Sequence, residues 1–551
     1  MTISIPSFFT RIKGYLRALV PHSALKLDGT AFRAAYRFAL PLMVLYELVS
    51  FSSWLLPTAS SPIFLIIIGL TAVLAMVRFD LAMLVLLAEL FVGSQGGYMI
   101  AFGAEWGLQL SVRHALFLLL VAIWFAELLA ASFAGGERRR AAWAWLQKLT
   151  SARIFLPFAL LMLAIAFGIA RGVAFGHPYD LVFFDVDRSL YFALFPALVT
   201  AFAAPKMIER AAALLCSAVS VAVFKALVVL FFFSHRVFDV AKMLYLWIRD
   251  TRVGEITVMV ADFYRIFFQS QIFILVSMFL AALFVAYSRS MKDRGAKLAA
   301  AFVTWAMVSM LLSLSRSFWF GGAVATCALF VLLVWGRAGV TAWKRLVLLG
   351  LGSVLVAVGV IALTYSFPYP NKNGGISLAS IFSDRAFSFD DDAAKSRWAL
   401  LPKLTEAAML HPVFGSGYGA TVTYETHDPR LKAANSSSRY TTYAFEWGYH
   451  DIWLKIGAFG FGMYVWFLFS LLRPLFLRIR ASRAAFRHSD MVFDGGDKQQ
   501  SIVAAGLFVG LVALLGTNVF SPYLNHPLGI GILLLAGALV ANGAFVARSE
   551  A

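Results

Sequence analysis

Long apolar segments separated by short basic ones run through this 551-residue chain and restrict what it can fold into. Hydrophobic residues make up 61% of the sequence, charged residues make up 14%, and the mean hydropathy is +0.80. A soluble domain is closer to half apolar and a quarter charged. A helix that crosses a membrane needs about 20 predominantly apolar residues. The sequence therefore predicts an all-α polytopic integral membrane protein.

About fourteen segments, within a range of twelve to fourteen, are predicted to be transmembrane helices. These are 35–56, 62–77, 80–94, 113–134, 153–171, 189–204, 210–234, 265–287, 297–314, 318–336, 345–366, 451–472, 501–521 and 527–547. With this number of spans, the basic N-terminus and the basic segments 135–148, 288–297, 336–345 and 473–488 all lie on one side. Basic loops are typical of the cytoplasmic side, so both termini are predicted to be cytoplasmic. The net charge of +18 belongs to these loops and does not indicate nucleic-acid binding.

The predicted spans divide the chain into four parts. These are a basic amphipathic segment on the cytoplasmic membrane face (1–34), eleven spans (35–366), a large outside loop (367–450) and three spans (451–547). Loops of this length are usually functional or disordered. Within the loop, SRWALLPKLTEAAML (396–410) places Trp398, Leu401, Leu404 and Ala408 on one helical face. This spacing predicts a short amphipathic helix lying across the outer membrane face.

His450 begins an apolar helix pattern, GYHDIWLKIGAFG, directly after the large loop. Gly457 lies two turns further along the same predicted face, and Gly460 completes a Gly-x-x-Gly spacing that lets a neighbouring helix approach closely. An imidazole, with an ordinary pKa of about 6.5, suits a general base. An interfacial histidine without a catalytic role is the alternative interpretation.

Several arginines fall on the outer side, against the general trend of the basic residues. They are Arg188, Arg265, Arg316 and Arg397. The planar guanidinium can donate two parallel hydrogen bonds to the oxygens of one phosphate. Several arginines on the outer side therefore suggest that the protein binds a substrate with an anionic headgroup there. Ordinary anchoring at the membrane interface is the alternative for each. Nearby, HPVFGSGYGA (411–420) contains Gly415 and Gly417, which either shape a substrate pocket or form a simple turn; the nucleotide-binding spacing is missing.

Two further features carry charge. Asp185 and Asp187 form an acidic pair on the outer side, of a kind that binds a metal ion in some lipid-phosphate-sugar transferases. Lys225 lies well inside a predicted span, where a charge is a functional candidate or half of a structural ion pair. Its candidate partners are Glu47, Glu89 and Glu127.

Three motifs resemble elements of the O-antigen ligase and polysaccharide polymerase superfamily. HPVFGSGYGA resembles its glycine-rich element, and SLSRSFWFGG resembles its serine–arginine element. YHDIWLKIGAFG resembles the element in which a histidine opens a transmembrane helix after the large periplasmic loop. The order and placement of the motifs also agree, over roughly residues 300–540.

The resemblance implies transfer of a glycan from undecaprenyl diphosphate to a sugar hydroxyl, at the periplasmic side of the bacterial inner membrane. It implies no metal or other cofactor. The acceptor is lipid A-core for a ligase and another lipid-linked repeat for a polymerase, with a flippase and a chain-length regulator as further partners. His450 matches the catalytic histidine of the family, and Arg316 and Arg397 match arginines that would hold the diphosphate; Arg188 and Arg265 are further candidates.

The sequence departs from the family pattern in two ways. Asp451 replaces the usual asparagine, and a negative neighbour favours a protonated His450, which weighs against the role of base. The chain length and the number of spans exceed those usual for a ligase, which favours a polymerase. Three alternatives stay open: a flippase or transporter of lipid-linked sugars, a metal-dependent transferase that uses Asp185 and Asp187, and a non-catalytic scaffold.

Overall fold

The computed structural model describes most of the chain. The described residues are 29–93, 100–103, 110–259, 263–371, 381, 385, 392–426, 438–482 and 495–545. The membrane-surface prediction for the N-terminal segment lies mostly outside them, and the first described helix, α2, already begins at Gly29.

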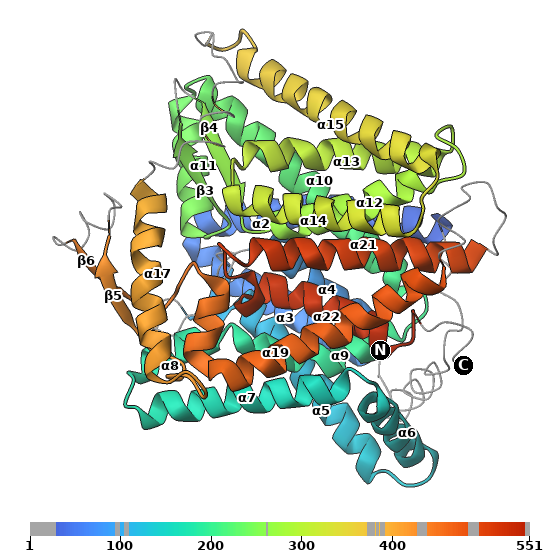
Figure 1. Cartoon of the computed structure of the whole chain (residues 1–551), viewed down its shortest axis with the longest axis vertical. Coiled ribbons are helices and arrows are strands. Elements are labelled where there is room, and N and C mark those ends of the chain that lie inside the picture. The colour runs from blue at the N-terminus through green and yellow to red at the C-terminus, as the bar shows by residue number, and fades with distance from the viewer. Residues whose placement is uncertain are drawn as a thin grey trace.

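Most of the helices run along one common direction and form a bundle (Figure 1). They are α2 (Gly29–Leu55), α3 (Ser60–Val77), α4 (Phe79–Val92), α5 (Val112–Phe133), α6 (Glu137–Ser151), α7 (Phe155–Ala174), α8 (Tyr179–Val186), α9 (Phe195–Phe202), α10 (Met207–Ser234), α11 (Phe238–Asp250), α12 (Gln271–Ala286), α13 (Arg294–Leu312), α14 (Arg316–Trp335), α15 (Val340–Ser366), α17 (Asp392–Leu410), α19 (Gly448–Ala481), α21 (Gly495–Thr517) and α22 (Pro527–Ala541). Short 3₁₀ helices are η1 (Pro57–Ala59), η3 (Ser189–Leu194) and η4 (Tyr523–Asn525).

In the described part of the chain, three antiparallel hairpins interrupt the helical pattern. They are β1 (Ala101–Phe102) with β2 (Leu110–Ser111), β3 (Gly254–Val258) with β4 (Tyr264–Phe268), and β5 (Val422–Glu425) with β6 (Arg439–Thr442). One hairpin corrects a predicted boundary. The eighth span was predicted to begin at Arg265, but Arg265 pairs with Thr257 in the β3–β4 ladder and the helix begins at Gln271. An apolar strand and an apolar helix are not distinguished by composition.

The prediction of an all-α polytopic membrane protein is confirmed, and each predicted span overlaps a helix of the structure. Ten helices in the described residues are long and apolar enough to cross a membrane. The remaining predicted spans correspond to shorter helices, such as α4 with 14 residues. At 1.5 Å per residue, about 21 Å of helix does not cover a hydrocarbon core of about 30 Å. Most residues of α4, α12 and α22 are buried among the other helices instead.

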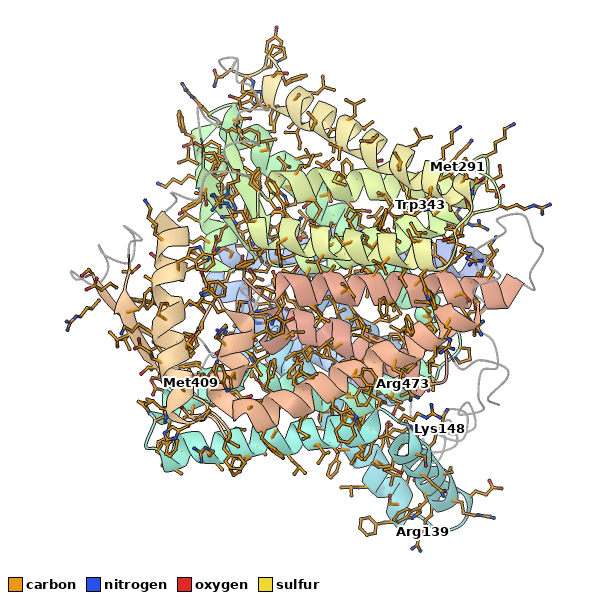
Figure 2. The ribbon with its side chains drawn as sticks, in the orientation of Figure 1. Arg139, Lys148, Met291, Trp343, Met409 and Arg473 are labelled. Atoms are coloured by element: carbon orange, nitrogen blue, oxygen red, sulfur yellow. The ribbon has the colours of Figure 1, made fainter. Side chains whose placement is uncertain are left out.

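The described residues of the predicted basic segments 135–148, 288–297, 336–345 and 473–488 gather at one end of the bundle, called here the basic end. Arg139, Lys148, Met291, Trp343 and Arg473 all lie toward this end, whereas Met409 lies at the opposite end (Figure 2). The opposite end, called here the loop end, carries α17 and the β5–β6 hairpin (Figure 1). The separation agrees with the alternation of basic and non-basic loops along the sequence.

The helix α17 lies across the ends of the bundle helices and has its own small core (Figure 1). Leu404 and Ala408 are buried as predicted, against Trp447 and Leu454, and Leu401 is partly buried. Trp398 was expected on the same buried face but is 56% exposed. Its ring makes an edge-to-face contact with that of Trp447. The expected amphipathic helix therefore exists, and its apolar side packs on the start of α19.

The buried Lys225 of α10 has a partner among the predicted candidates. Its Nζ lies 2.7 Å from Glu47 Oε1 of α2. Glu89 is instead paired with Arg113, at 2.6 Å between Oε2 and Nε, and both side chains are almost completely buried. Each charge is thereby compensated within the bundle. The interpretation of Lys225 as half of an ion pair is confirmed.

Candidate functional site

The helix that carries His450 is discontinuous. Gly457 adopts φ 67° and ψ 179° within α19, so the hydrogen-bonded helix is broken at this residue. The break separates the N-terminal part, 448–456, called here the His450 half-helix, from the longer part that continues to Ala481. Only glycine adopts this backbone conformation without a steric penalty. A helix break leaves backbone amides and carbonyls without partners, and these must be satisfied inside a membrane protein.

The glycine-rich loop 411–419 satisfies the groups at the break. Two of its amides donate to carbonyls of the His450 half-helix, and two amides beyond the break donate to loop carbonyls. The bonds join Ser416 N to Leu454 O (2.7 Å), Gly417 N to Lys455 O (3.1 Å), Ala458 N to Pro412 O (2.8 Å) and Phe459 N to Val413 O (3.0 Å). The two motifs that resembled separate family elements therefore form one structural unit.

The glycines allow this loop to approach the helices closely. Gly415 and Gly417 both have positive φ, and a Cβ on Gly417 would lie 2.2 Å from the amide nitrogen of Gly172 in α7. The expectation that Gly457 admits a neighbouring helix is wrong, since a Cβ there would meet Val413 O of the loop at 2.3 Å. Gly460 is packed against Ile456 of its own chain segment. Because the helix is broken at Gly457, the loop 411–419 packs against this residue in place of a neighbouring helix.

His450 lies at the loop end, between two tryptophans. Its ring is partly buried, and its centroid is 6.2 Å from that of Trp447 and 6.3 Å from that of Trp453. Within the described part of the chain, its side chain takes part in no hydrogen bond or ion pair. The imidazole nitrogens are therefore free to accept or donate a proton, which a general base or acid requires.

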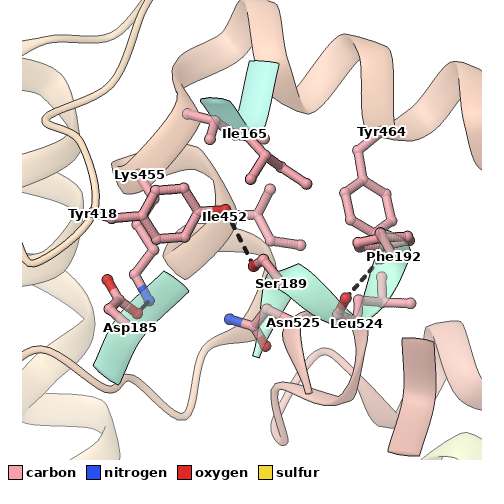
Figure 3. Close-up of a pocket in the computed structure, with 11 residues that line it drawn as sticks. Ile165, Asp185, Ser189, Phe192, Tyr418, Ile452, Lys455, Tyr464, Leu524 and Asn525 are labelled. Carbon is pink, nitrogen blue, oxygen red and sulfur yellow. Dashed lines mark hydrogen bonds and ion pairs between the residues drawn. The ribbon is translucent and has the colours of Figure 1, made fainter. Parts of the chain in front are cut away.

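Lys455 of the same half-helix is the centre of a buried ionic network, and its side chain lies beside Asp185 (Figure 3). Lys455 Nζ is ion-paired with Asp185 of α8 and lies 2.6 Å from Asp451 Oδ1; the lysine is 5% exposed and each carboxylate 2%. The second oxygen of Asp185 accepts a hydrogen bond from Gly419 N at 3.0 Å, and that of Asp451 accepts one from Asn525 Nδ2. The negative charge of Asp451 is thus engaged by Lys455, which reduces its expected influence on His450.

Tyr418 closes a small pocket beside this network (Figure 3). Its hydroxyl donates to Ser189 Oγ at 3.2 Å. Burial raises the pKa of Tyr418 well above its usual range, and the negative charge of Asp185 adds to this effect. The phenol is therefore neutral and acts as a hydrogen-bond donor. The pocket is lined by Ile165, Asp185, Ser189, Phe192, Tyr418, Ile452, Lys455, Ile456, Tyr464, Leu524 and Asn525.

Asp185 and Asp187 do not act as a pair. Asp185 faces Lys455, whereas the Asp187 carboxylate lies 2.9 Å from His114 Nε2 of α5. No group of three or more histidine, cysteine or acidic side chains is placed to hold a metal ion among the residues that the structure describes. The two side chains therefore engage different partners, although the two aspartates are only two positions apart in the sequence.

Two of the predicted arginines meet at the turn between α13 and α14. Arg265 Nε donates to Ser313 O at 2.8 Å, and Arg316 Nε donates to Arg385 O at 2.9 Å. Arg385 in turn donates to Leu314 O at 3.1 Å, so a third arginine joins them. These three residues are called here the arginine cluster. Leu314, at the centre, has a positive φ of 42°.

The other two predicted arginines lie closer to the His450 half-helix. Arg397 of α17 forms a two-pronged ion pair with Glu446, and its carbonyl accepts from Trp447 Nε1 at 2.9 Å. Arg188 is partly buried and acts electrostatically on Asp451 and His526. Within the described residues, Arg188 has no ion-pair partner. Arg188 is therefore available to an anion, whereas Arg397 is shared with a carboxylate.

Sequence reasoning missed several residues of this site. Lys455, Asn525 and Arg385 were not singled out, and Asp185 was considered only as a metal ligand. One signal for Lys455 was present, because it follows Asp451 by four positions inside an apolar helix, where charged residues are expected to pair. No comparable sequence signal links Lys455 to Asp185 or Arg385 to the turn before α14.

Together these features define a multi-pass helical membrane protein with a polar, arginine-rich site at one end of its bundle. Residues 299–465 match the Wzy_C family, described as O-antigen ligase. The match supports membership of the O-antigen ligase and polysaccharide polymerase superfamily, as the motifs indicated, and it implies glycan transfer in surface polysaccharide assembly with lipid-linked donor and acceptor substrates. Arg188 and Arg265 lie outside the matched residues. No curated protein matches the chain.

Proposed function

We propose that the chain transfers a glycan from undecaprenyl diphosphate to a sugar hydroxyl, with His450 as the general base. One observation carries the proposal: His450 has no hydrogen-bond partner among the described residues and stands on a half-helix held by the buried Lys455 network. A base must be both uncommitted and fixed in position to act on a substrate hydroxyl. This combination is present within the region that matches the O-antigen ligase family.

In the proposed reaction, the acceptor oxygen attacks the anomeric carbon of the donor sugar. His450 takes the hydroxyl proton while the bond between that carbon and the diphosphate oxygen breaks. The diphosphate leaves with its electron pair and its negative charge, which cationic groups stabilise. Arg316 and Arg265 of the arginine cluster, together with Arg188 and Arg397, are proposed to bind this diphosphate. The mechanism uses no metal or other cofactor.

The proposed site faces the periplasm of a bacterial inner membrane. The gathering of the basic segments at the opposite end supports this orientation, because basic loops are retained in the cytoplasm. Both termini are then cytoplasmic, and α17 lies across the periplasmic membrane face. We favour a polymerase, whose acceptor is another lipid-linked repeat, over a ligase, whose acceptor is lipid A-core. A flippase and a chain-length regulator are the proposed partners.

The test is the glycan profile of a deletion strain that carries the wild-type protein or His450→Ala. Single repeats on the lipid carrier without polymer would identify a polymerase, and long polymer on the carrier beside bare lipid A-core would identify a ligase. Lys403→Ala, an exposed position of α17, is the matched control and should restore the normal profile. A normal profile with His450→Ala would show that His450 is not the base.

The transporter and metal-dependent alternatives have distinct outcomes. A transporter would retain its function with His450→Ala, because it forms no bond that needs a base. A metal-dependent transferase would lose activity in excess EDTA. The different partners of Asp185 and Asp187 favour neither a shared metal nor a mechanism built on both residues. Full activity of the purified protein in EDTA is the expected result.

A further inference from the structure

Arg171 lies in the last turn of α7, next to the glycine-rich loop, and no motif or match singles it out. Its Nε donates to Gly415 O at 2.9 Å. Its guanidinium carbon lies over the ring of Phe175, 4.6 Å from the ring centroid. The same carbon lies 5.9 Å from the ring centroid of Phe167. A cation stacked on aromatic rings is held in a fixed orientation. Arg171 is therefore an oriented charge at the loop end of the bundle.

Among the described residues, the Nη atoms of Arg171 take part in no hydrogen bond and no carboxylate lies within ion-pair distance, so its charge is not neutralised there. His411 faces the same aromatic ring, with its centroid 4.8 Å from that of Phe175. A guanidinium and an imidazole thus share one exposed phenylalanine. A guanidinium presents a fork of donors that matches phosphate oxygens.

An apolar surface begins directly beside these groups. Val413, Phe414 and Phe459 are 53%, 47% and 53% exposed, and Phe414 contacts both Phe167 and Phe459. This surface lies along α7 and the second part of α19, which run side by side (Figure 1). A cation at the end of an exposed apolar surface matches a lipid that has an anionic head and a long hydrocarbon tail.

The same residues connect this surface to His450. Trp453 donates from Nε1 to Pro412 O at 3.0 Å, and its ring faces that of His450. The loop segment from His411 to Gly415 therefore contacts both Arg171 and Trp453, and the ring of Trp453 lies next to that of His450.

We propose that Arg171, Phe175 and His411 bind the phosphate next to the hydrocarbon tail of a polyprenyl diphosphate, whose tail lies on the exposed faces of Phe414 and Phe459, while the arginines of the proposed function bind the phosphate that carries the sugar. This rests on the proposed function in that it assigns the lipid part of the donor to a lateral face of the same site. The occupant is a polyprenyl carrier because the loop that forms part of this surface also accepts a hydrogen bond from Trp453 of the His450 half-helix. A generic phospholipid would need no connection to that half-helix.

The test measures binding without turnover. The full-length protein in nanodiscs is labelled with a photoreactive undecaprenyl phosphate, and unlabelled undecaprenyl diphosphate or excess phosphatidylglycerol competes. Arg171→Ala should weaken labelling by roughly tenfold, and Arg171→Lys by less, because it keeps the charge but loses the fork. Phe414→Ser, which leaves the Arg171 hydrogen bond intact, should also weaken labelling. Only the polyprenyl competitor should displace the label.

The matched control is Arg249→Ala. Arg249 also lies over an aromatic ring, at 5.8 Å from that of Tyr245, but it is paired with Asp250 at 2.8 Å. Its loss should leave labelling unchanged. Wild-type labelling with both Arg171→Ala and Phe414→Ser would overturn the proposal, and so would equal displacement by phosphatidylglycerol.

The binding readout separates this proposal from the proposed function. His450→Ala should bind the label like the wild type, because the histidine acts on the acceptor hydroxyl. If the wild type binds the label but transfers no glycan, the proposed function fails while the lipid site stands. If it transfers glycan and Arg171→Ala changes neither binding nor transfer, the lipid site is wrong while the function stands.

Discussion

Lys455 and Asp185 form a buried ion pair although 270 positions separate them in the sequence. The pair joins the His450 half-helix to α8 across the core of the site (Figure 3). Burying two charges is costly unless their remaining donors and acceptors are also satisfied. Asp451 and the Gly419 amide supply these additional interactions. The half-helix is therefore held in place even though Gly457 separates it from the rest of α19.

Loss of the lysine charge should destabilise the protein strongly. Lys455→Met leaves two carboxylates buried without their cation, which costs about 3–5 kcal/mol in the free energy of unfolding. Adding Asp185→Asn should recover part of this loss, because one uncompensated charge is removed. Unfolding in detergent measures both effects. Lys403→Met, which removes an exposed pair with Glu406, is the control and should change stability little. An equally small effect of Lys455→Met would show that the pair is not important for stability.

A methyl group at Gly457 should disrupt the unit formed by the helix break and the glycine-rich loop. Gly457→Ala forces an L-residue into a φ of 67° and places Cβ 2.3 Å from Val413 O. The expected cost is at least about 2 kcal/mol, with loss of glycan transfer because His450 shifts. Gly462→Ala is the control in the same helix, where a Cβ would meet nothing within 4 Å. Wild-type stability and activity of Gly457→Ala would contradict the role of the break.

Stability should decrease as the pH falls, in part through His526. Burial lowers the pKa of His526 well below its usual range, and the positive charges of Arg188 and Arg113 lower it further. The unfolded chain binds a proton below a pH of about 6.5, whereas the folded chain does not. The free energy of unfolding should then fall by up to about 1.4 kcal/mol per pH unit below that point.

His526→Asn tests this contribution. The neutral Nδ1 of His526 accepts a hydrogen bond from Leu528 N at 3.3 Å at the start of α22, and an asparagine oxygen accepts in the same position. The variant should keep the helix cap and show a flatter decrease in unfolding temperature between pH 7 and pH 5. The same pH dependence in the wild type and in the variant would assign the effect to other groups.

The ion pair of Lys225 and Glu47 is expected to be structural. Lys225→Met alone removes the cation beside the buried Glu47 carboxylate and should cost about 3–5 kcal/mol. The double variant Lys225→Met with Glu47→Gln removes both charges and should recover most of the stability and the normal glycan profile. Folded protein without glycan transfer would instead indicate that the charged pair takes part in function.

Much of the fold was predictable because membrane helices are encoded locally. A helix that spans the membrane must satisfy its own backbone and reach across the bilayer, so its length and composition are visible in the sequence. The charge pattern likewise predicted which segments gather at one end of the bundle. The boundary error at Arg265 arose because a short apolar strand has the same composition as the start of a helix.

The candidate site was predictable only in part. His450 and the two glycine-rich motifs were visible because each is a local pattern. The sequence did not reveal that the loop enters the break at Gly457. This unit is created by four backbone hydrogen bonds between residues that are 38–46 positions apart. The arginine cluster was likewise hidden, because Arg265 and Arg385 reach the turn before Arg316 from distant segments.

The sequence by itself determined that this protein is a helical bundle in a membrane, with its basic segments at one end and a histidine opening a helix after a large loop. Local periodicity, charge and motif order are sufficient for these features. Only the tertiary structure decided which residues surround that histidine. The pairing of Lys455 with Asp185 and the position of Arg171 against Gly415 depend on how distant helices pack, and this packing has no local signature in the chain.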